Sequence, residues 1–366
     1  MKTEDLLTLI ALRRIELSSL SFFKLLGYFQ DLSQLRKAKD KEERFVRLGF
    51  SKKLCQEILT ALKEIASREN QGVLEICQKE NIRLLSFADK DYPSLLRNIP
   101  DKPYLLFVQG VLKEGLPLLA VVGARDMSSY AQAIMDDLLT PLVEAGVGIV
   151  SGLAYGVDSL AHKVALCHQG YTIAVLGSGL LNIYPSEHQY LAEKILKSGG
   201  LLLSEYLPRC KPRKHYFPQR NRIIAGISQA LLVVEAGLRS GTRITARLAL
   251  EYNRDILAVP GNINQPNSFG TNNLLKEGAF PATRPEDIAN LLGIKLEKSQ
   301  LPKAAQLSAL PQEVQKVLTS LAKSPATLDK LAAEMELSLG EALTLISELE
   351  LLGLIYKDAL GYYSLK

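Results

Sequence analysis

Cysteine is scarce in this sequence, and several catalytic signatures are missing from it. The 366 residues include four cysteines, which lie far apart and form no C-x-x-C pair. Neither a disulfide scaffold nor a zinc knuckle is therefore indicated, and we expect a reducing compartment. The sequence also lacks a G-x-S-x-G elbow, an H-E-x-x-H pair and a Walker A loop. We predict no catalytic residue, no metal site and no cofactor.

Long apolar segments are also absent. The longest stretch without Lys, Arg, Asp or Glu is 164–186, and it contains His168, Gly177 and Pro185. Such a segment would place polar groups and irregular backbone in lipid, so we predict a strand and loop and no membrane contact. The N-terminus carries acidic residues early and has no small-residue cleavage site, which argues against a secretory signal. We expect a cytoplasmic protein.

The formal net charge of +5 is unevenly distributed. Residues 1–66 carry a net charge of +4, and residues 67–307 also carry +4. Residues 308–366 hold five basic and eight acidic side chains, a net charge of −3. A polyanion should therefore prefer the first two regions and avoid the third.

The central part of the chain, 67–293, predicts an α/β domain. Short runs rich in Val, Ile and Leu alternate with stretches of helical periodicity. The predicted strands are 104–108, 118–123, 147–152, 172–177, 201–205, 230–236 and 256–261. Continuous apolar runs separated by helices are typical of parallel strands buried on both faces. We predict a Rossmann-like, doubly wound, mostly parallel sheet.

Smaller predicted domains flank the sheet. Residues 1–66 predict short helices, two of them capped by Ser18 and Ser51. They would form either a helix-hairpin-helix (SAM-like) module that grips nucleic acid or a purely structural cap. Residues 294–307 have a weak pattern and are predicted to be a linker. Residues 308–366 predict three helices and a β-hairpin, which is the order of a winged helix.

Glycine-rich loops follow five of the predicted strands. They span 121–129, 151–159, 176–185, 235–246 and 259–273. Glycine lets the backbone approach a ligand closely, and the amides that begin the next helix can accept an anion. Because ligands bind at the carboxyl ends of such strands, we expect these loops to form one binding edge.

The segment 208–222, PRCKPRKHYFPQRNR, gives the clearest physical signal. It contains six basic residues, no acidic residue, and the aromatic pair Tyr216 and Phe217. Cations that pair with phosphates and rings that stack on bases suit single-stranded nucleic acid. The alternative is a solvated loop whose basic residues pair with distant acids.

Asp158 and His162 are spaced to share a helix face, and Ser151 lies near them in sequence. No third metal ligand accompanies the pair, and nothing brings the three residues together as a triad. We therefore favour a structural hydrogen bond or helix pair over a metal or hydrolytic site.

Several strings together resemble the DNA-processing protein A (DprA, or Smf) family. They are SGLAYGVDSLAH (151–162), GYTIAVLGSGL (170–180), YPSEH (184–188), LLSE (202–205), FPQRNRIIAGIS (217–228), VVEA (233–236), ITA (244–246), AVPG (258–261) and FGTNNLLKEGA (269–279). The resemblance spans about 85–290 in a consistent order. This chain departs from the family pattern at Ala124, Ala131 and Arg243.

The resemblance implies a non-enzymatic recombination mediator that binds incoming single-stranded DNA during natural transformation. It implies a homodimer that protects this DNA and loads a RecA-type recombinase, with a single-strand-binding protein as a further partner. The DNA-binding residues it implies are Arg125, Ser151, Gly152, Lys214, Phe217, Arg220, Asn221, Arg222, Ser240, Gly241, Thr242 and Arg243.

Two other functions compete with this one. Rossmann-like phosphoribohydrolases act on nucleotides, but Asn273 occupies the position that their catalytic glutamate would need. A duplex-reading winged helix would use 339–353 as its recognition helix. That helix carries Glu341, Glu348 and Glu350 without any Lys or Arg, so it would repel phosphates.

Overall fold

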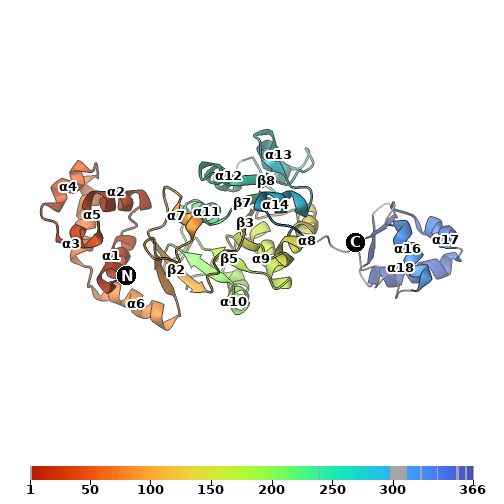
Figure 1. Ribbon diagram of the computed structural model, residues 1–366, viewed down its shortest axis with the longest axis horizontal. Helices are drawn as coiled ribbons and strands as arrows, with labels where there is room; N and C mark the ends of the chain where they lie inside the picture. The colour runs from red at the N-terminus through yellow and green to blue at the C-terminus, as the bar shows by residue number, and fades with distance from the viewer. Residues whose placement is uncertain are drawn as a thin grey trace. The chain divides into compact units, whose positions relative to one another are not determined.

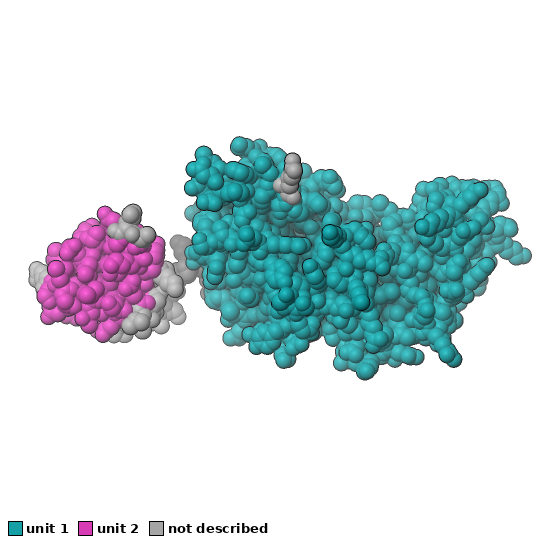
Figure 2. All heavy atoms as spheres, turned by 180° about the vertical axis from the view of Figure 1, so that it is seen from behind, with its two compact units in different colours: residues 1–296 teal, residues 297–366 magenta. Residues whose placement is uncertain are grey.

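The computed structural model divides the chain into two compact units, 1–296 and 297–366 (Figure 2). It describes residues 2–238, 240–296, 311–321, 324–335, 337–351, 354–358 and 361–365. Most of the predicted linker, 297–307, lies outside these ranges. Among the described residues, no helix is both long enough and apolar enough to cross a bilayer.

A nine-stranded sheet forms the centre of the first unit, in the order β1-β2-β6-β5-β4-β3-β7-β8-β9 (Figure 1). The strands are β1 (Arg83–Ser86), β2 (Leu105–Gly110), β3 (Leu118–Val122), β4 (Gly148–Ser151), β5 (Thr172–Val175), β6 (Leu201–Ser204), β7 (Ala230–Val233), β8 (Asp255–Ala258) and β9 (Phe280–Pro281). All strands from β3 to β9 pair in parallel. The predicted mostly parallel, Rossmann-like sheet is confirmed.

All seven predicted strands occur in this sheet, but β2 runs antiparallel to both of its neighbours, β1 and β6. Only the loop 111–117 connects β2 to β3, whereas crossover helices separate most of the strands that follow. Consecutive strands that run in the same direction need a crossover connection, usually a helix, and the loop 111–117 contains no helix. The direction of β2 could therefore not be predicted from its apolar run alone.

Helices cover both faces of the sheet because its strand residues alternate between two buried clusters. Leu119 and Val121 of β3 pack with α8 (Ser129–Glu144), α9 (Val157–Cys167) and α14 (Pro285–Leu292). Ala120 and Val122 face the other cluster, which includes residues of α7 (Ser94–Arg97), α11 (Tyr216–Ile227), α12 (Thr242–Glu251) and α13 (Phe269–Lys276). Helix α10 (Gln189–Lys197) contributes Leu191 and Ile195 to a third cluster. The architecture is therefore a doubly wound sandwich.

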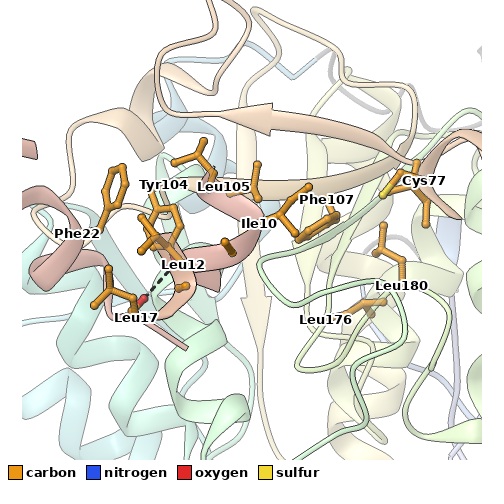
Figure 3. Close-up of a cluster of buried hydrophobic side chains, with 14 of the residues drawn as sticks. Ile10, Leu12, Leu17, Phe22, Cys77, Tyr104, Leu105, Phe107, Leu176 and Leu180 are labelled. Atoms are coloured by element: carbon orange, nitrogen blue, oxygen red, sulfur yellow. Dashed lines mark hydrogen bonds between the residues drawn. The ribbon is translucent and has the colours of Figure 1, made fainter. Parts of the chain in front are cut away.

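The N-terminal helices share that third cluster with the sheet. They are α1 (Thr3–Arg14), α2 (Ser19–Phe29), α3 (Leu32–Lys37), α4 (Lys41–Arg47), α5 (Lys52–Lys63) and α6 (Arg68–Lys79). Ser18 and Ser51 cap α2 and α5 as predicted, each accepting a backbone N–H bond at 3.2 Å. Figure 3 shows Ile10 and Leu12 beside Tyr104 and Phe107. The helical segment is thus packed onto the edge of the sheet.

A buried charge network also joins α1 to the sheet and to α11. The Glu205 carboxylate, which follows β6, lies 3.3 Å from Arg13 of α1 and 2.6 Å from Arg222 of α11. Arg222 also lies 3.6 Å from Asp101. Glu205 is only 2% exposed, so it compensates the charge of Arg13 away from water and shares the compensation of Arg222 with Asp101.

The second unit has the predicted winged-helix order. It contains α16 (Gln312–Leu321), α17 (Leu328–Met335) and α18 (Leu339–Leu351), followed by the antiparallel strands β10 (Ile355–Lys357) and β11 (Tyr363–Leu365). Val317, Leu331, Ile346 and Tyr363 are among the buried residues of its own small core. The predicted helices and hairpin are confirmed.

We predict that Glu205→Ala lowers the free energy of unfolding by about 3–5 kcal/mol, because it leaves the buried Arg13 guanidinium without its carboxylate partner and Arg222 with Asp101 alone. Urea unfolding followed by circular dichroism measures the change. Glu43→Ala is the matched control, since its partner Arg47 forms an exposed pair and the loss should stay within about 1 kcal/mol. Equal effects of the two substitutions would contradict a structural role for the network.

Candidate nucleic-acid interface

A pocket of about 530 Å³ lies at the carboxyl ends of the central strands. Strand β3 pairs with β4 on one side and with β7 on the other, so the strand order reverses there. The pocket is lined by Val122, Gly123, Arg125, Ala154, Asp158, Tyr184, Lys214, Phe217, Pro218, Arg220, Asn221, Ile224, Ser240, Gly241, Thr242, Ile244 and Thr245. Such a reversal is where doubly wound folds bind ligands.

Eight of the twelve predicted site residues line this pocket. They are Arg125, Lys214, Phe217, Arg220, Asn221, Ser240, Gly241 and Thr242. Four of the five predicted glycine loops contribute to the wall, and the fifth, 259–273, does not. The expectation that loops from neighbouring strands meet at one edge therefore describes most of the pocket.

The basic segment 208–222 is only partly a loop. Helix α11 begins at Tyr216, with Phe217 and Pro218 in its first turn. Proline is tolerated in the first turn because the backbone N–H it lacks has no helical partner there. The helical period then turns Arg220 inward, while Lys214 and His215 remain exposed ahead of the helix. The six basic residues are consequently not equivalent.

Arg220 is buried at the base of the pocket. Its Nη1 donates to the carbonyl oxygen of Gly152 at 2.6 Å and to that of Val175. Burial lowers its pKa, and the nearby Asp158 carboxylate opposes that effect. A Cβ on Gly152 would lie 2.4 Å from Nη2 of Arg220, so only glycine allows this approach. These bonds give Arg220 a structural role at the site, and its contact with DNA stays a prediction.

Other basic residues of the segment pair with distant acids. Arg222 contacts Glu205 and lies outside the pocket. Arg213 donates to the Glu16 carboxylate at 2.6 Å, and the Tyr216 hydroxyl donates to the same group at 2.6 Å. Pairing with distant acids thus holds for these two arginines, but Arg222 is partly buried within α11 and not part of a solvated loop. Arg209, Lys211 and Lys214 are exposed and form no ion pair with any described residue.

Phe217 is half-buried, with one edge against the backbone of Gly177. The Arg125 guanidinium lies 5.7 Å from its ring centroid, within cation–π range. The Tyr184 ring lies 5.4 Å away at an angle of 50°. Phe217 therefore has support on its flanks and retains some exposure within the pocket.

The segment 240–243 is divided between the pocket and the surface beside it. Ser240 donates to the Thr242 hydroxyl, which donates to the carbonyl oxygen of Gly123 at 3.2 Å. This fixes the start of α12 beside the pocket. Arg243 turns away and lies 3.3 Å from Glu277. Arg239 lies outside the described residues.

Ser151 does not line the pocket. Its Oγ donates to the carbonyl oxygen of Val121 at 2.6 Å, and the residue is fully buried. Together with Gly152, Arg222 and Arg243, it is one of four predicted site residues outside the pocket wall. Contact of these four residues with DNA stays a prediction.

Asp158 and His162 have separate structural partners. The Asp158 carboxylate accepts the Gly152 N–H at 3.1 Å, and burial raises its pKa against the effect of Arg220. The Thr172 hydroxyl donates to the carbonyl oxygen of Ile149, so it accepts from Nδ1 of His162 at 2.7 Å. No cluster of three potential metal ligands occurs among the described residues.

Tyr184 is a pocket residue that the sequence analysis missed. It is 43% exposed and follows β5 in the loop that also carries Pro185 and His188. The string YPSEH (184–188) contributes only to the family resemblance. Its place in a glycine-bearing loop after a predicted strand was the available signal.

The fold and the pocket define a Rossmann-like protein with a basic, aromatic site at the carboxyl ends of its strands. Residues 83–293 match the sequence model of the DNA recombination-mediator protein A family, and residues 301–357 match that of the DprA winged helix domain. Because the first match covers more than half of the chain, the protein belongs to the DNA recombination-mediator protein A family.

Individual relatives agree with this assignment. Protein Smf of Escherichia coli is 39% identical over 297 residues, which cover 79% of each chain. DNA processing protein DprA of Streptococcus pneumoniae is 43% identical over 206 residues, 56% of this chain and 72% of the relative. Its X-ray structure matches with a TM-score of 0.67 at 34% identity, covering 76% of this chain and 95% of that one.

A second solved structure is that of DNA processing protein A from Helicobacter pylori, described as having a unique single-stranded DNA binding mode. It matches with a TM-score of 0.52 at 31% identity and covers 58% of this chain and 95% of that chain. A DNA-processing, recombination-related role follows for the present protein from its family.

We predict that His162 makes the fold acid-sensitive. Burial, with smaller effects of Arg220 and His188, lowers its pKa from 6.5 to about 3. Below about pH 6.5 the unfolded chain binds a proton at this imidazole that the folded chain does not. Stability should therefore fall from about pH 6.5 toward pH 3, by about 1.4 kcal/mol per pH unit from this group.

Urea unfolding at a series of pH values measures this contribution. In His162→Asn the amide nitrogen replaces Nδ1 toward Thr172, so the variant should show a shallower loss below pH 6.5, whatever its stability at neutral pH. His168→Asn, at the end of the same helix, is the control for the exchange of histidine for asparagine. Parallel curves for wild type and His162→Asn would refute the prediction.

Proposed function

We propose that the protein binds single-stranded DNA in this pocket. The observation that carries the proposal is the arrangement at the start of α11. Phe217 keeps part of its ring accessible within the pocket, with the exposed cations Arg125 and Lys214 in the same wall. This arrangement suits a single strand, because its unpaired bases can stack on the aromatic ring while its phosphates pair with the cations beside the ring.

Electrostatics around the pocket support an anionic ligand. Lys214, Lys211 and Arg209 are exposed and have no acidic partner among the described residues. The start of α12 adds Ser240 and the backbone of Gly241 to the wall, and a helix N-terminus favours negative charge. Asp158 also lines the pocket, but its carboxylate lies near the positively charged Arg220 guanidinium, which reduces its repulsion of an anionic ligand.

Family membership supports a wider role around this binding step. We propose that the protein is a recombination mediator of natural transformation, which protects incoming single strands in the cytoplasm and loads a RecA-type recombinase onto them. It would act as a homodimer, with a single-strand-binding protein as a further partner. The single-stranded DNA binding described for the Helicobacter pylori relative supports the ligand assignment.

The role proposed here is not enzymatic. Asn273 in α13 offers an amide where a phosphoribohydrolase would need a carboxylate. The Ser151 hydroxyl is committed to a backbone carbonyl and has no hydrogen bond to His162. Duplex reading by α18 is disfavoured as well, because Glu341, Glu348 and Glu350 are all exposed on that helix.

We predict that the protein prefers single-stranded to double-stranded oligonucleotides and that its affinity falls steeply with salt. Lys214→Ala should weaken single-strand binding and reduce the salt slope, because one phosphate contact is lost. Fluorescence anisotropy titrations over a salt series measure both quantities. Lys53→Ala, at an exposed lysine of α5, is the control and should bind like wild type. Equal affinity for single and double strands would overturn the proposal.

We predict that Phe217→Ala weakens single-strand binding by about 1–3 kcal/mol with an unchanged salt slope, because stacking rather than charge is lost. Phe217 also packs against Gly177, so thermal unfolding must be measured beside affinity. Phe269→Ala, which truncates a 37% exposed phenylalanine of α13 outside the pocket wall, serves as the control. A stable Phe217→Ala protein with wild-type affinity would exclude base stacking on this ring.

We predict that removing residues 308–366 leaves most of the single-strand affinity intact, because that segment is net acidic and belongs to a separate compact unit. The same anisotropy titration compares the truncated and complete chains. Loss of binding by a truncated protein with an unchanged thermal transition would place the DNA site in the winged helix instead.

A further inference from the structure

Two exposed tyrosines lie beside the pocket, on loops that follow neighbouring strands. Tyr155, in the loop after β4, is 41% exposed, and Tyr184, in the loop after β5, is 43% exposed. Large aromatic side chains gain stability from burial, so a pair left in solvent at a binding edge suggests a surface for a ligand. Only Tyr184 touches the pocket itself.

Ring contacts lead outward from the pocket. Phe217 and Tyr184 have centroids 5.4 Å apart. The Tyr155 ring packs edge-on against His188 with centroids 5.1 Å apart. A hydrogen bond to the Glu187 carboxylate chiefly raises the pKa of Tyr155, and the nearby Tyr184 adds to this. Two ring pairs thus lie on these neighbouring loops: Phe217–Tyr184 at the pocket, and Tyr155–His188, in which His188 belongs to η1 (Ser186–His188) and follows Tyr184 by four residues.

Both loops are held in place without a ligand. His188 Nδ1 donates to the carbonyl oxygen of Leu153 at 2.8 Å, which ties the second loop to the first. The Ser178 hydroxyl donates to the carbonyl oxygen of Asn182 at 2.6 Å, inside the second loop. Side chains on such preformed loops lose little entropy when a ligand binds.

The charge beyond the pocket changes sign. Lys214 and Arg125 flank the Phe217 end, whereas exposed Glu187 lies beside Tyr155. A phosphate is repelled next to this carboxylate, but a base is not. A strand that leaves the pocket in this direction therefore has to present its bases, and not its backbone, to the protein.

We propose that Tyr184 and the Tyr155–His188 pair form a stacking track, on which the bases of a single strand continue after they leave the pocket. This inference rests on the proposed function and extends it. The track takes unpaired nucleobases of any sequence, because every base has a π-face. It predicts a binding site longer than the pocket and asymmetric, with phosphate contacts at the Phe217 end and base contacts at the Tyr155 end.

The test is a length series of oligothymidylates from about 4 to about 16 nucleotides, the usual range for single-strand-binding sites. Wild-type affinity should rise as the strand becomes long enough to reach the track. Tyr155→Ala should bind the shortest strands like wild type but lose about 5-fold or more in affinity for the longest. Tyr184→Leu, which keeps apolar volume without a flat ring, should show the same loss for long strands.

Conservative variants separate stacking from structure. Tyr155→Phe and Tyr184→Phe retain the rings and should bind long strands like wild type. Tyr190→Ala is the matched control: Tyr190 is a 64% exposed tyrosine of α10, outside the pocket wall, with Lys194 over its ring at 4.7 Å. It should behave as wild type at every length, and melting temperatures should be unchanged for all five variants.

The outcomes distinguish the track from the proposed function. If the wild type binds no single strand, the proposed function fails. If it binds, but Tyr155→Ala matches wild type at every length, the pocket stands and the track is refuted. A loss for Tyr155→Ala that is equal at all lengths, or an equal loss for Tyr190→Ala, also contradicts the track.

Discussion

The guanidinium of Arg220 is the contact on which the binding edge depends. It bonds to two carbonyl oxygens, one just after β4 and one at the end of β5, from a helix that lines the pocket and packs against one face of the sheet. The nearby Asp158 carboxylate raises the pKa of Arg220 against the effect of burial, and it also accepts the N–H of Gly152. Because a buried charge is tolerated only when it is paired and hydrogen-bonded, these groups stabilise one another as a set.

This arrangement holds the start of α11 rigidly, and with it the exposed side chains that face the pocket. Phe217 lies three residues before Arg220, so both side chains project from the same side of α11. The buried residue fixes the helix against the strand ends, and the more exposed one faces the ligand space. The loops of Tyr155 and Tyr184 begin at the same strand ends. The two carbonyl groups that Arg220 binds therefore lie at the base of the loops that hold these tyrosines.

Much of this structure could be predicted from local patterns. Apolar runs identified the central strands, Ser18 and Ser51 marked helix starts, and glycine-bearing loops indicated the binding edge. The partners of the basic residues could not be predicted, because they come from remote segments. Arg213 is paired by Glu16, and Arg220 is bound by a carbonyl far earlier in the chain. Composition located the basic segment, but only tertiary packing distinguishes its free cations from its structural ones.

Glu16 links the N-terminal helices to the segment that leads into α11. Its carboxylate, just past the end of α1, holds both the Arg213 guanidinium and the Tyr216 hydroxyl at 2.6 Å. The approach to α11 is thereby tethered to a residue about two hundred positions earlier. Removal of the N-terminal residues up to and including Glu16 would release both groups at once and leave Arg213 without its ion pair. Susceptibility to a protease at the N-terminus would then be coupled to ligand occupancy at the centre of the chain.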